Sequence, residues 1–310
     1  MNGEHRHFLK SYFLIVFFVL GFVATVNWWV DPYNQLGRNN SGIYFSVERQ
    51  AKKSIMRYEH NALLIGSSIM ADVDPDKLCG YNFYNASFRA AVPEEIFFYL
   101  DRFMGKERMT VIGLDFYMFN ETEFPLITKK QWLSYLYDIP DYLISFRVFK
   151  DSLVTGYKRK RGDPVEIFLN GRHNDYIQIE RDRHFSSYDF SHSKESLRKG
   201  PFYQYHFSQK RLEYLNQIKE LLEQKNIEYV ILINPINEEI LEMLRSMPRT
   251  YSILLNWKKM VKEIFPNTMD LSMSEYSLNS NYYKKDATHY KAEVGAMIIN
   301  KVLGCSSGGR

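Results

Sequence analysis

The 310-residue sequence predicts a three-layer α/β domain built on a parallel sheet and preceded by one transmembrane helix. Two observations support this prediction. Short apolar runs alternate with longer helical segments along most of the chain, which is typical of a parallel sheet covered by helices on both faces. Before them, residues 11–30 form a single apolar segment long enough to cross a membrane.

The composition is that of a folded protein, because 45% of the residues are hydrophobic. The 40 Lys and Arg residues nearly balance the 36 Asp and Glu residues, which argues against nucleic-acid binding. A basic run at residues 158–161, beside Gly162 and Pro164, predicts a solvated loop, with a membrane or anionic-glycan contact as the alternative. Cys79 and Cys305 indicate neither a metal site nor a disulfide framework, and the sequence leaves open whether they pair.

Residues 11–30 contain no charged side chain and predict an uncleaved membrane anchor. Trp28 and Trp29 suit a membrane interface, and Pro32 suits the end of a helix. The alternatives are a buried core helix and a signal peptide, whose apolar region is usually shorter, about 7 to 15 residues. Arg6 and Lys10 favour a cytoplasmic tail at residues 1–10, so the remainder is expected outside the cytoplasm.

Residues 31–60 are polar, contain proline and glycine, and predict a linker. The main domain is expected over residues 61–304 and to begin with a buried strand at 62–65 that Gly66 ends. Further strands are expected near residues 81–84 and 109–114. The helix between them, over residues 93–103, has Pro93 at its first position.

The carboxyl-terminal half repeats this alternation. It predicts helices over residues 208–224, 238–245, 253–264 and 291–303, and strands over 227–233 and 268–271. Between the halves, residues 120–205 are rich in Tyr, Phe, Arg and Asp without a clean period, and predict an insertion over the edge of the sheet. Residues 305–310 are expected to be a flexible tail.

Polar residues follow the predicted strands at the edge where open parallel sheets bind ligands. They are Gly66-Ser67-Ser68, Asn85-Ala86-Ser87, Asp115, Asn234 and Asp286-Ala287-Thr288-His289. A serine hydroxyl becomes a good nucleophile when an imidazole removes its proton, and a carboxylate holds that imidazole in one tautomer. The sequence therefore predicts a catalytic triad in which Ser68 attacks, His289 accepts the proton and Asp286 orients the ring.

These residues resemble the motif blocks of the SGNH (GDSL-like) hydrolase superfamily. Gly66-Ser67-Ser68 resembles its nucleophile block, Asn85 to Ala90 its second block, Val111 to Asp115 its third block, and Asp286 to His289 its Asp-x-x-His block. The resemblance covers residues 62–303 apart from the insertion. It implies a flavodoxin-like three-layer fold and serine esterase or acyltransferase chemistry, with no cofactor and no metal.

The resemblance also implies an oxyanion or substrate-binding site that contains Asn85 and the backbone N–H of Ala90, which stands where the family has glycine. Asp115 stands where the family has asparagine, and an ionised carboxylate cannot donate a hydrogen bond to an oxyanion. Two alternatives stay open: Asp115 is a structural residue, or Asn120 takes over the donor role.

The anchor and the Asp31-Pro32-Tyr33-Asn34 segment narrow the resemblance to the SGNH-like proteins that work with membrane-bound O-acyltransferases. That likeness implies acyl transfer, most simply of acetyl, to an extracellular or cell-wall polysaccharide. The implied partners are the glycan acceptor, a membrane-bound O-acyltransferase and the membrane, with no nucleic acid. A carbohydrate esterase of the same fold and a non-catalytic tethered scaffold are the alternatives.

Aromatic clusters at residues 117–119 and 202–206 suit stacking on sugar rings, although packing within the protein is the commoner use. Four histidines in or beside the insertion lack the spacing of metal ligands and are expected to be surface or hydrogen-bonded residues. They are His173, His184, His192 and His206.

Overall fold

The computed structural model describes residues 3–45, 58–134, 138–174, 190–284 and 286–305. The chain divides into two compact units. One comprises Met1–Arg57 and Leu133–Ile167, and the other comprises Tyr58–Trp132 and Phe168–Arg310 and holds the sheet. The expected insertion over residues 120–205 is therefore not one piece, because its middle part packs with the amino-terminal helix.

The sheet unit contains five parallel strands in the order β2-β1-β3-β4-β5. They are β1 (Ala62–Ile65), β2 (Phe83–Asn85), β3 (Met109–Leu114), β4 (Glu228–Ile233) and β5 (Met269–Asp270). This flavodoxin-like order confirms the predicted fold class. The strand order reverses between β1 and β3, which pair from Ala62 with Met109 to Ile65 with Ile112. The carboxyl ends of β1 and β3 therefore border the crevice where such sheets bind ligands.

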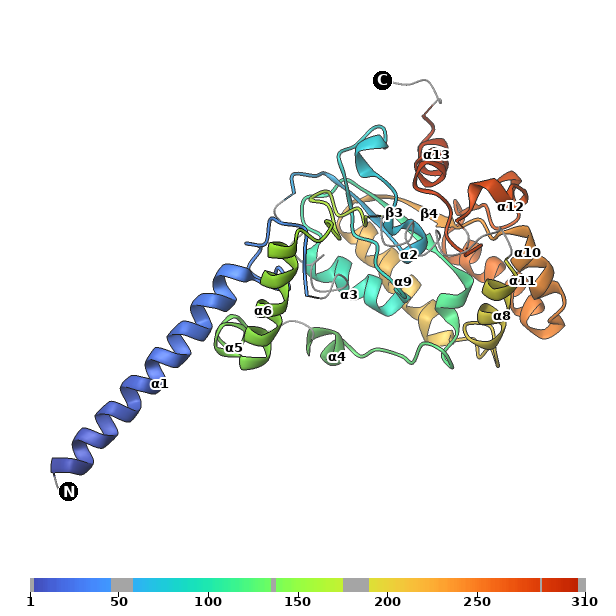
Figure 1. Cartoon of the computed structure of the whole chain (residues 1–310). Coiled ribbons are helices and arrows are strands. Elements are labelled where there is room, and N and C mark those ends of the chain that lie inside the picture. The colour runs from blue at the N-terminus through green and yellow to red at the C-terminus, as the bar shows by residue number, and fades with distance from the viewer. Residues whose placement is uncertain (1–2, 46–57, 135–137, 175–189, 285, 306–310) are drawn as a thin grey trace. The chain divides into compact units, whose positions relative to one another are not determined.

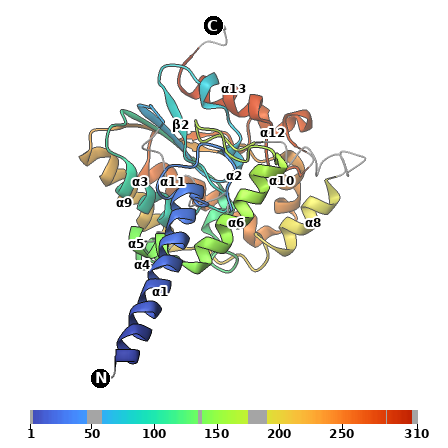
Figure 2. The ribbon, with the colours of Figure 1, turned by 60° about the vertical axis from the view of Figure 1, so that its left-hand side comes forward.

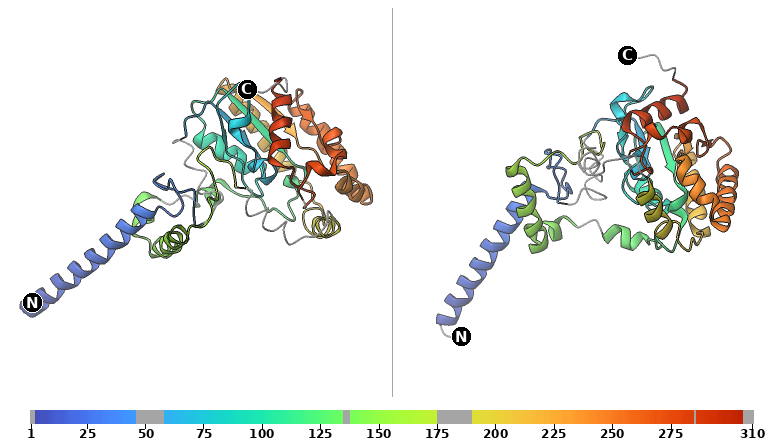
Figure 3. Two further views of the ribbon diagram at one scale, coloured as in Figure 1. Left: turned by 45° about the horizontal axis from the view of Figure 1, so that its top comes forward. Right: turned by 45° about the vertical axis from the view of Figure 1, so that its right-hand side comes forward.

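Helices cover both faces of the sheet, as the complete burial of β1 and β3 requires. Ala62, Leu64 and Val111 point to one face and pack with α13 (Ala292–Val302). The paired helices α3 (Pro93–Phe103) and α9 (Gln209–Gln224) lie on the other side of the strands from α13 (Figure 3).

The remaining elements of the sheet unit connect these layers. They are α2 (Ser68–Ala71), η2 (Pro75–Lys77), η3 (Phe116–Phe119), α4 (Lys129–Ser134), whose last two residues belong to the other unit, α8 (Ser191–Lys199), α10 (Glu238–Arg245), α11 (Pro248–Ile264), α12 (Glu275–Leu278) and η4 (Ser280–Tyr282). The strands β1 and β3 and the helices α3 and α10 lie at the predicted residues. Helix α11 begins before the predicted residue 253, because Pro248 occupies its first turn.

A buried ion pair joins α3 to α9. Arg211 and Glu94 have fully buried side chains, and Arg211 Nε and Nη2 each lie 3.0 Å from an oxygen of Glu94. Arg211 also donates to the carbonyl oxygens of Asn120 and Phe124. The guanidinium therefore fixes the chain after η3 onto the two helices.

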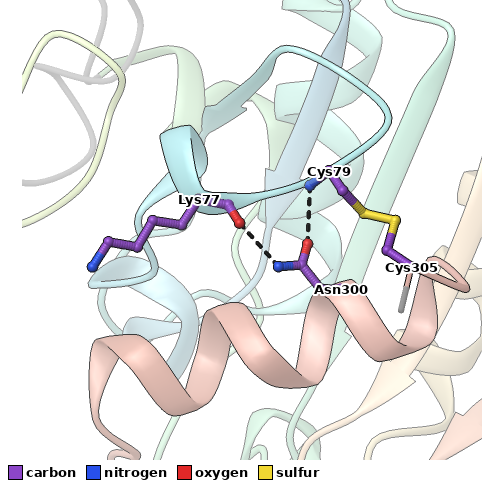
Figure 4. Close-up of a disulfide and its surroundings, with 4 residues drawn as sticks. All are labelled: Lys77, Cys79, Asn300 and Cys305. Carbon is purple, nitrogen blue, oxygen red and sulfur yellow. Dashed lines mark hydrogen bonds between the residues drawn. A yellow bond between two sulfur atoms is a disulfide. The ribbon is translucent and has the colours of Figure 1, made fainter. Parts of the chain in front are cut away.

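A disulfide joins Cys79 to Cys305, a pairing that the sequence left open (Figure 4). Asn300, on α13, accepts a hydrogen bond from the Cys79 N–H at 2.9 Å and donates one to the Lys77 carbonyl at 2.9 Å. The expectation of a flexible tail from residue 305 is wrong at Cys305, because this residue is covalently bonded to the segment after η2. Residues 306–310 lie outside the described residues.

The other unit is helical. Helix α1 (Gly3–Val30) is long and apolar enough over His7–Val30 to span a membrane. Helices α5 (Ile139–Ile144) and α6 (Phe146–Arg161) pack beside its carboxyl-terminal part (Figures 1 and 2).

Two expectations for this unit need correction. Residues 31–45 of the predicted linker are folded, because the buried Asp31 carboxylate accepts hydrogen bonds from the N–H groups of Leu36 and Arg38. The basic run at residues 158–161 is the last turn of α6 rather than a loop. Cations favour a helix carboxyl terminus, and Gly162 ends this helix at φ +74°.

Candidate active site

Two adjacent serines follow β1, and they have different environments. Ser67 is fully buried and caps α2, since its Oγ accepts a hydrogen bond from the Ile69 N–H at 3.1 Å. Ser68 is the first residue of α2 and is partly exposed. The hydroxyl that a substrate can reach is therefore that of Ser68.

The segment Asp286 to His289 is a tight turn that one carboxylate organises. Asp286 Oδ1 accepts hydrogen bonds from the N–H groups of Thr288 and His289, both at 3.0 Å. Its Oδ2 lies 2.7 Å from His289 Nδ1. Ala287, between them, has φ +58° and is completely buried. The same carboxylate therefore fixes the backbone of the turn and the orientation of the imidazole.

The structure brings the three predicted residues into one hydrogen-bonded chain. His289 Nε2 lies 2.8 Å from Ser68 Oγ, across a sequence separation of 221 residues. The other ring nitrogen faces Asp286, which favours the tautomer with the proton on Nδ1. Nε2 is then free to accept the serine proton, as nucleophilic catalysis requires.

The charges of the pair stabilise each other. Burial disfavours the imidazolium ion, but the neighbouring Asp286 carboxylate outweighs this effect and raises the pKa of His289 above its usual value. Burial also disfavours the carboxylate, but His289 and the N–H groups of the turn together lower the pKa of Asp286. The carboxylate therefore stays ionised while the imidazole titrates.

We expect acylation of Ser68 to accelerate with rising pH through an inflection above 6.5, because only the neutral imidazole accepts a proton. Asp286→Asn should move this inflection to lower pH, since burial, which lowers the pKa, then acts without the carboxylate. The same substitution should slow acylation by about 10⁴-fold through loss of the correct tautomer. The measurement is the pH dependence of labelling by a fluorophosphonate.

The control for this pH profile is Asp101→Asn, which removes an exposed carboxylate paired with Lys129. It should leave both the inflection and the rate unchanged. An inflection that stays in place in Asp286→Asn would contradict the assigned pairing.

Asp115, directly after β3, binds the residues that follow the two neighbouring strands. Its carboxylate accepts hydrogen bonds from Ser67 Oγ at 2.5 Å and Asn234 Nδ2 at 2.9 Å. Burial raises the pKa of Asp115 to about 6, although both hydrogen bonds and the nearby His289 oppose the rise. The Asp115 carboxylate therefore links the ends of β1, β3 and β4, and of the two alternatives for this residue the structure favours the structural one.

The side chains of Asn85 and Asn120 are used to hold loops. Asn85 Nδ2 lies 2.9 Å from the carbonyl oxygens of Met70 and Val73. Asn120 Nδ2 donates to the Pro201 carbonyl at 2.9 Å, and its Oδ1 accepts from the Thr122 N–H. These hydrogen bonds hold both side chains in place, and the role of Asn85 and Asn120 at an oxyanion or substrate site stays a prediction.

Ala90 belongs to a segment held beside the serine loop. The N–H of Ala86 donates to the Leu64 carbonyl at 2.7 Å, and the N–H of Phe88 donates to the Gly66 carbonyl at 3.1 Å. Ala90 has φ +49°, in the backbone region that favours glycine. Its role as a backbone donor to an oxyanion stays a prediction.

Sequence reasoning missed one functional candidate, the hydroxyl of Tyr117 in η3. The hydroxyls of Ser67 and Ser68 are close enough to this hydroxyl to act on its pKa, which they lower. Burial and the Asp115 charge raise the pKa of Tyr117 well above its usual range, so that the hydroxyl keeps its proton. Its position two residues after Asp115 could have indicated this role. The sequence pattern instead placed Tyr117 in the aromatic cluster at residues 117–119.

An apolar cavity of about 40 Å³ adjoins the triad. Ile69 and Thr288, the chain neighbours of Ser68 and His289, belong to its wall. The other lining residues include Leu114, Phe116, Leu197, Phe202, Ile233 and Ile240. Its apolar wall suits the hydrocarbon part of an acyl group.

Part of the aromatic cluster at residues 202–206 packs inside the protein. Tyr205 stacks on Phe116 with ring centroids 4.3 Å apart and donates a hydrogen bond to the Phe116 carbonyl. Phe202 is buried, and Tyr203 is exposed. Of the four histidines, His173 is buried and His206 exposed, whereas His184 and the side chain of His192 lie outside the described residues.

The chain was compared with protein families, curated proteins and solved structures. No protein-family model matches the chain, and no curated protein matches it. Among solved structures, the chain is similar to a protein from Streptococcus pneumonia assigned as a platelet activating factor, with 13% sequence identity and a TM-score of 0.40. That match covers 98% of each chain.

Proposed function

We propose that this chain is a membrane-anchored SGNH-type serine O-acyltransferase that works outside the cytoplasm and acylates a polysaccharide through a seryl intermediate. The observation that carries the proposal is the continuous hydrogen-bonded chain from Ser68 through His289 to Asp286. This arrangement is suited to acyl transfer, to an alcohol or to water, through a covalent acyl-serine.

In the first half-reaction, Ser68 Oγ attacks the carbonyl carbon of an acyl donor while His289 Nε2 takes the hydroxyl proton. The tetrahedral intermediate carries its negative charge on the former carbonyl oxygen. Tyr117 keeps its proton beside Ser68 and is assigned as one donor to this oxygen, with the Ala90 N–H as the second. Collapse of the intermediate breaks the bond to the leaving group, which receives the proton from His289.

In the second half-reaction, His289 takes a proton from a sugar hydroxyl, whose oxygen then attacks the acyl carbon of Ser68. The new ester leaves, and Ser68 regains its proton from His289. Each half-reaction is thus balanced by the same imidazole, and no cofactor takes part.

The apolar wall of the cavity beside the triad supports a group with a hydrocarbon part, and acetyl is the simplest acyl group of this kind. An outer location is supported by the disulfide between Cys79 and Cys305, since disulfides persist in oxidising compartments. Anchoring by α1 supports transfer to a polymer, because a tether raises the effective concentration of an acceptor at the membrane. A membrane-bound O-acyltransferase is the proposed source of acyl groups.

The purified chain should release 4-nitrophenol slowly from 4-nitrophenyl acetate, and added oligosaccharide should accelerate release while becoming acetylated. The physical reason is that a sugar held at the site reacts with acyl-Ser68 more readily than water does. Mass spectrometry of the sugar and absorbance of the phenol give the two readouts. Ser68→Ala, the matched control, should abolish both.

A carbohydrate esterase is the second candidate, because the His289 and Asp286 side chains are 24% and 27% exposed and water can reach them. Fast phenol release with no acetylated sugar, across several glycans, would favour it. A non-catalytic scaffold drew its support from Asp115. That support weakens because the Asp115 carboxylate has a structural role, in which it binds Ser67 and Asn234. If the chain released no 4-nitrophenol in a Ser68-dependent way, the scaffold would become the better candidate.

A further inference from the structure

Helix α6 buries several polar side chains, and both α5 and α6 expose large apolar ones. On α6 the buried residues include Asp151, Ser152 and Thr155. Phe146 and Leu153, in contrast, are 59% and 55% exposed. On α5, Ile139 and Ile144 are also exposed. A helix that packs onto a water-soluble domain normally shows the opposite distribution.

The polar interior holds these helices against α1. The amide of Asn27, a buried residue of α1, donates to the carbonyls of Leu143 and Ser145 at 2.8 and 3.1 Å. The same amide accepts a hydrogen bond from Ser152 Oγ at 3.0 Å. Packing through polar contacts, with apolar side chains left outside, is typical of helices surrounded by lipid.

Two contacts fix the position of α6 along α1. The ring of Phe149 lies 5.8 Å from that of Phe22, inside the apolar segment His7–Val30. At the other end, Arg159 donates to the carbonyl oxygen of Val30 at 2.7 Å. At about 1.5 Å per residue, Phe22 lies roughly 12 Å along the helix from Val30. Helix α6 therefore runs beside the last turns of the segment long enough to cross a membrane.

Basic side chains accompany the apolar ones on this surface. Arg147 and Lys150 are exposed between Phe146 and Leu153, and Lys160 is exposed near the end of α6. Long basic side chains can lie along apolar surface and place their charges at lipid phosphates. A hollow of about 620 Å³ beside α1 continues the surface, and Ile139, Leu143, Trp28 and Arg38 belong to its lining.

We propose that α5 and α6 lie in the membrane that α1 spans, at the boundary between acyl chains and headgroups. Phe146, Leu153 and Ile139 contact acyl chains, and Arg147, Lys150 and Lys160 contact the phosphates of anionic lipids. The occupant of this surface is lipid. The assignment does not depend on the catalytic proposal, because no residue of the triad belongs to this unit.

The test uses the full-length chain in vesicles of phosphatidylcholine and phosphatidylglycerol, with an NBD fluorophore on a single introduced cysteine. Phe146→Cys and Leu153→Cys are the reporting positions. Leu278→Cys, on an exposed residue of α12 in the other unit, is the water-facing reference. The native cysteines are paired and do not react with the label.

We expect lipid-attached nitroxides to quench positions 146 and 153, and aqueous iodide to quench position 278 preferentially. In vesicles of phosphatidylcholine alone, quenching by lipid at position 153 should decrease, because the basic side chains lose their anionic partners. Strong iodide quenching at 146 and 153 would overturn the proposal. Protection from both quenchers would also overturn it, in favour of a second copy of the chain covering this surface.

Discussion

Ser68→Ala should abolish reaction of the chain with a fluorophosphonate and lower acyl transfer by about 10⁶-fold. The hydroxyl of Ser68 lies 2.8 Å from His289 Nε2, which can take its proton during the attack. Labelling is measured by in-gel fluorescence, and the labelled peptide is identified by mass spectrometry.

Ser67→Ala is the matched control, because it removes the adjacent hydroxyl. It should keep the labelling, since Ser67 is buried and its Oγ faces Asp115. His289→Ala should lose the labelling as Ser68→Ala does. Tyr117→Phe should slow it by about 10²-fold to 10³-fold, the usual cost of one lost oxyanion donor. Label found on Ser67 would show that the nucleophile has been misassigned by one residue.

Arg211→Met should lower the free energy of unfolding of the sheet unit by about 3–5 kcal/mol, because it leaves the Glu94 carboxylate buried without its cation. The loss includes the hydrogen bonds of Arg211 to the carbonyls of Asn120 and Phe124. Urea unfolding, followed by circular dichroism on the detergent-solubilised chain, measures the change.

A second variant separates the buried charge from the lost contacts. Combining Arg211→Met with Glu94→Gln should recover part of the stability, since no unpaired charge then remains inside. The matched control is Lys129→Met, which breaks an exposed ion pair with Asp101 and should cost about 0–1 kcal/mol. Equal losses in Arg211→Met and Lys129→Met would show that the buried pair is not a special source of stability.

The sheet was predictable because its strands are short apolar runs with clear ends. Ala62–Ile65 and Met109–Leu114 form strands at the predicted residues, and Pro93 begins a helix as expected. The three triad residues could be proposed because each lies directly after a predicted strand or before the last predicted helix. Their mutual distances required the structure, since the strand order determines which ends are adjacent.

Other features depend on contacts that no local pattern records. Asp115 and Asn120 both follow β3, but only the tertiary structure shows that their side chains hold Ser67 and the segment around Pro201. Helix α6 could not be predicted from hydrophobic periodicity, because Asp151 and Ser152 face inward while Leu153 faces outward. Cys79 and Cys305 pair across 226 residues, a distance over which spacing gives no information.

The long sequence interval between Ser68 and His289 has a consequence for biosynthesis. A ribosome completes the amino-terminal half first, so Ser68 leaves the exit tunnel well before its base exists. Until His289 has been made and lies beside it, the Ser68 hydroxyl is an ordinary alcohol. A chain that stops before His289 therefore cannot activate Ser68 through this triad.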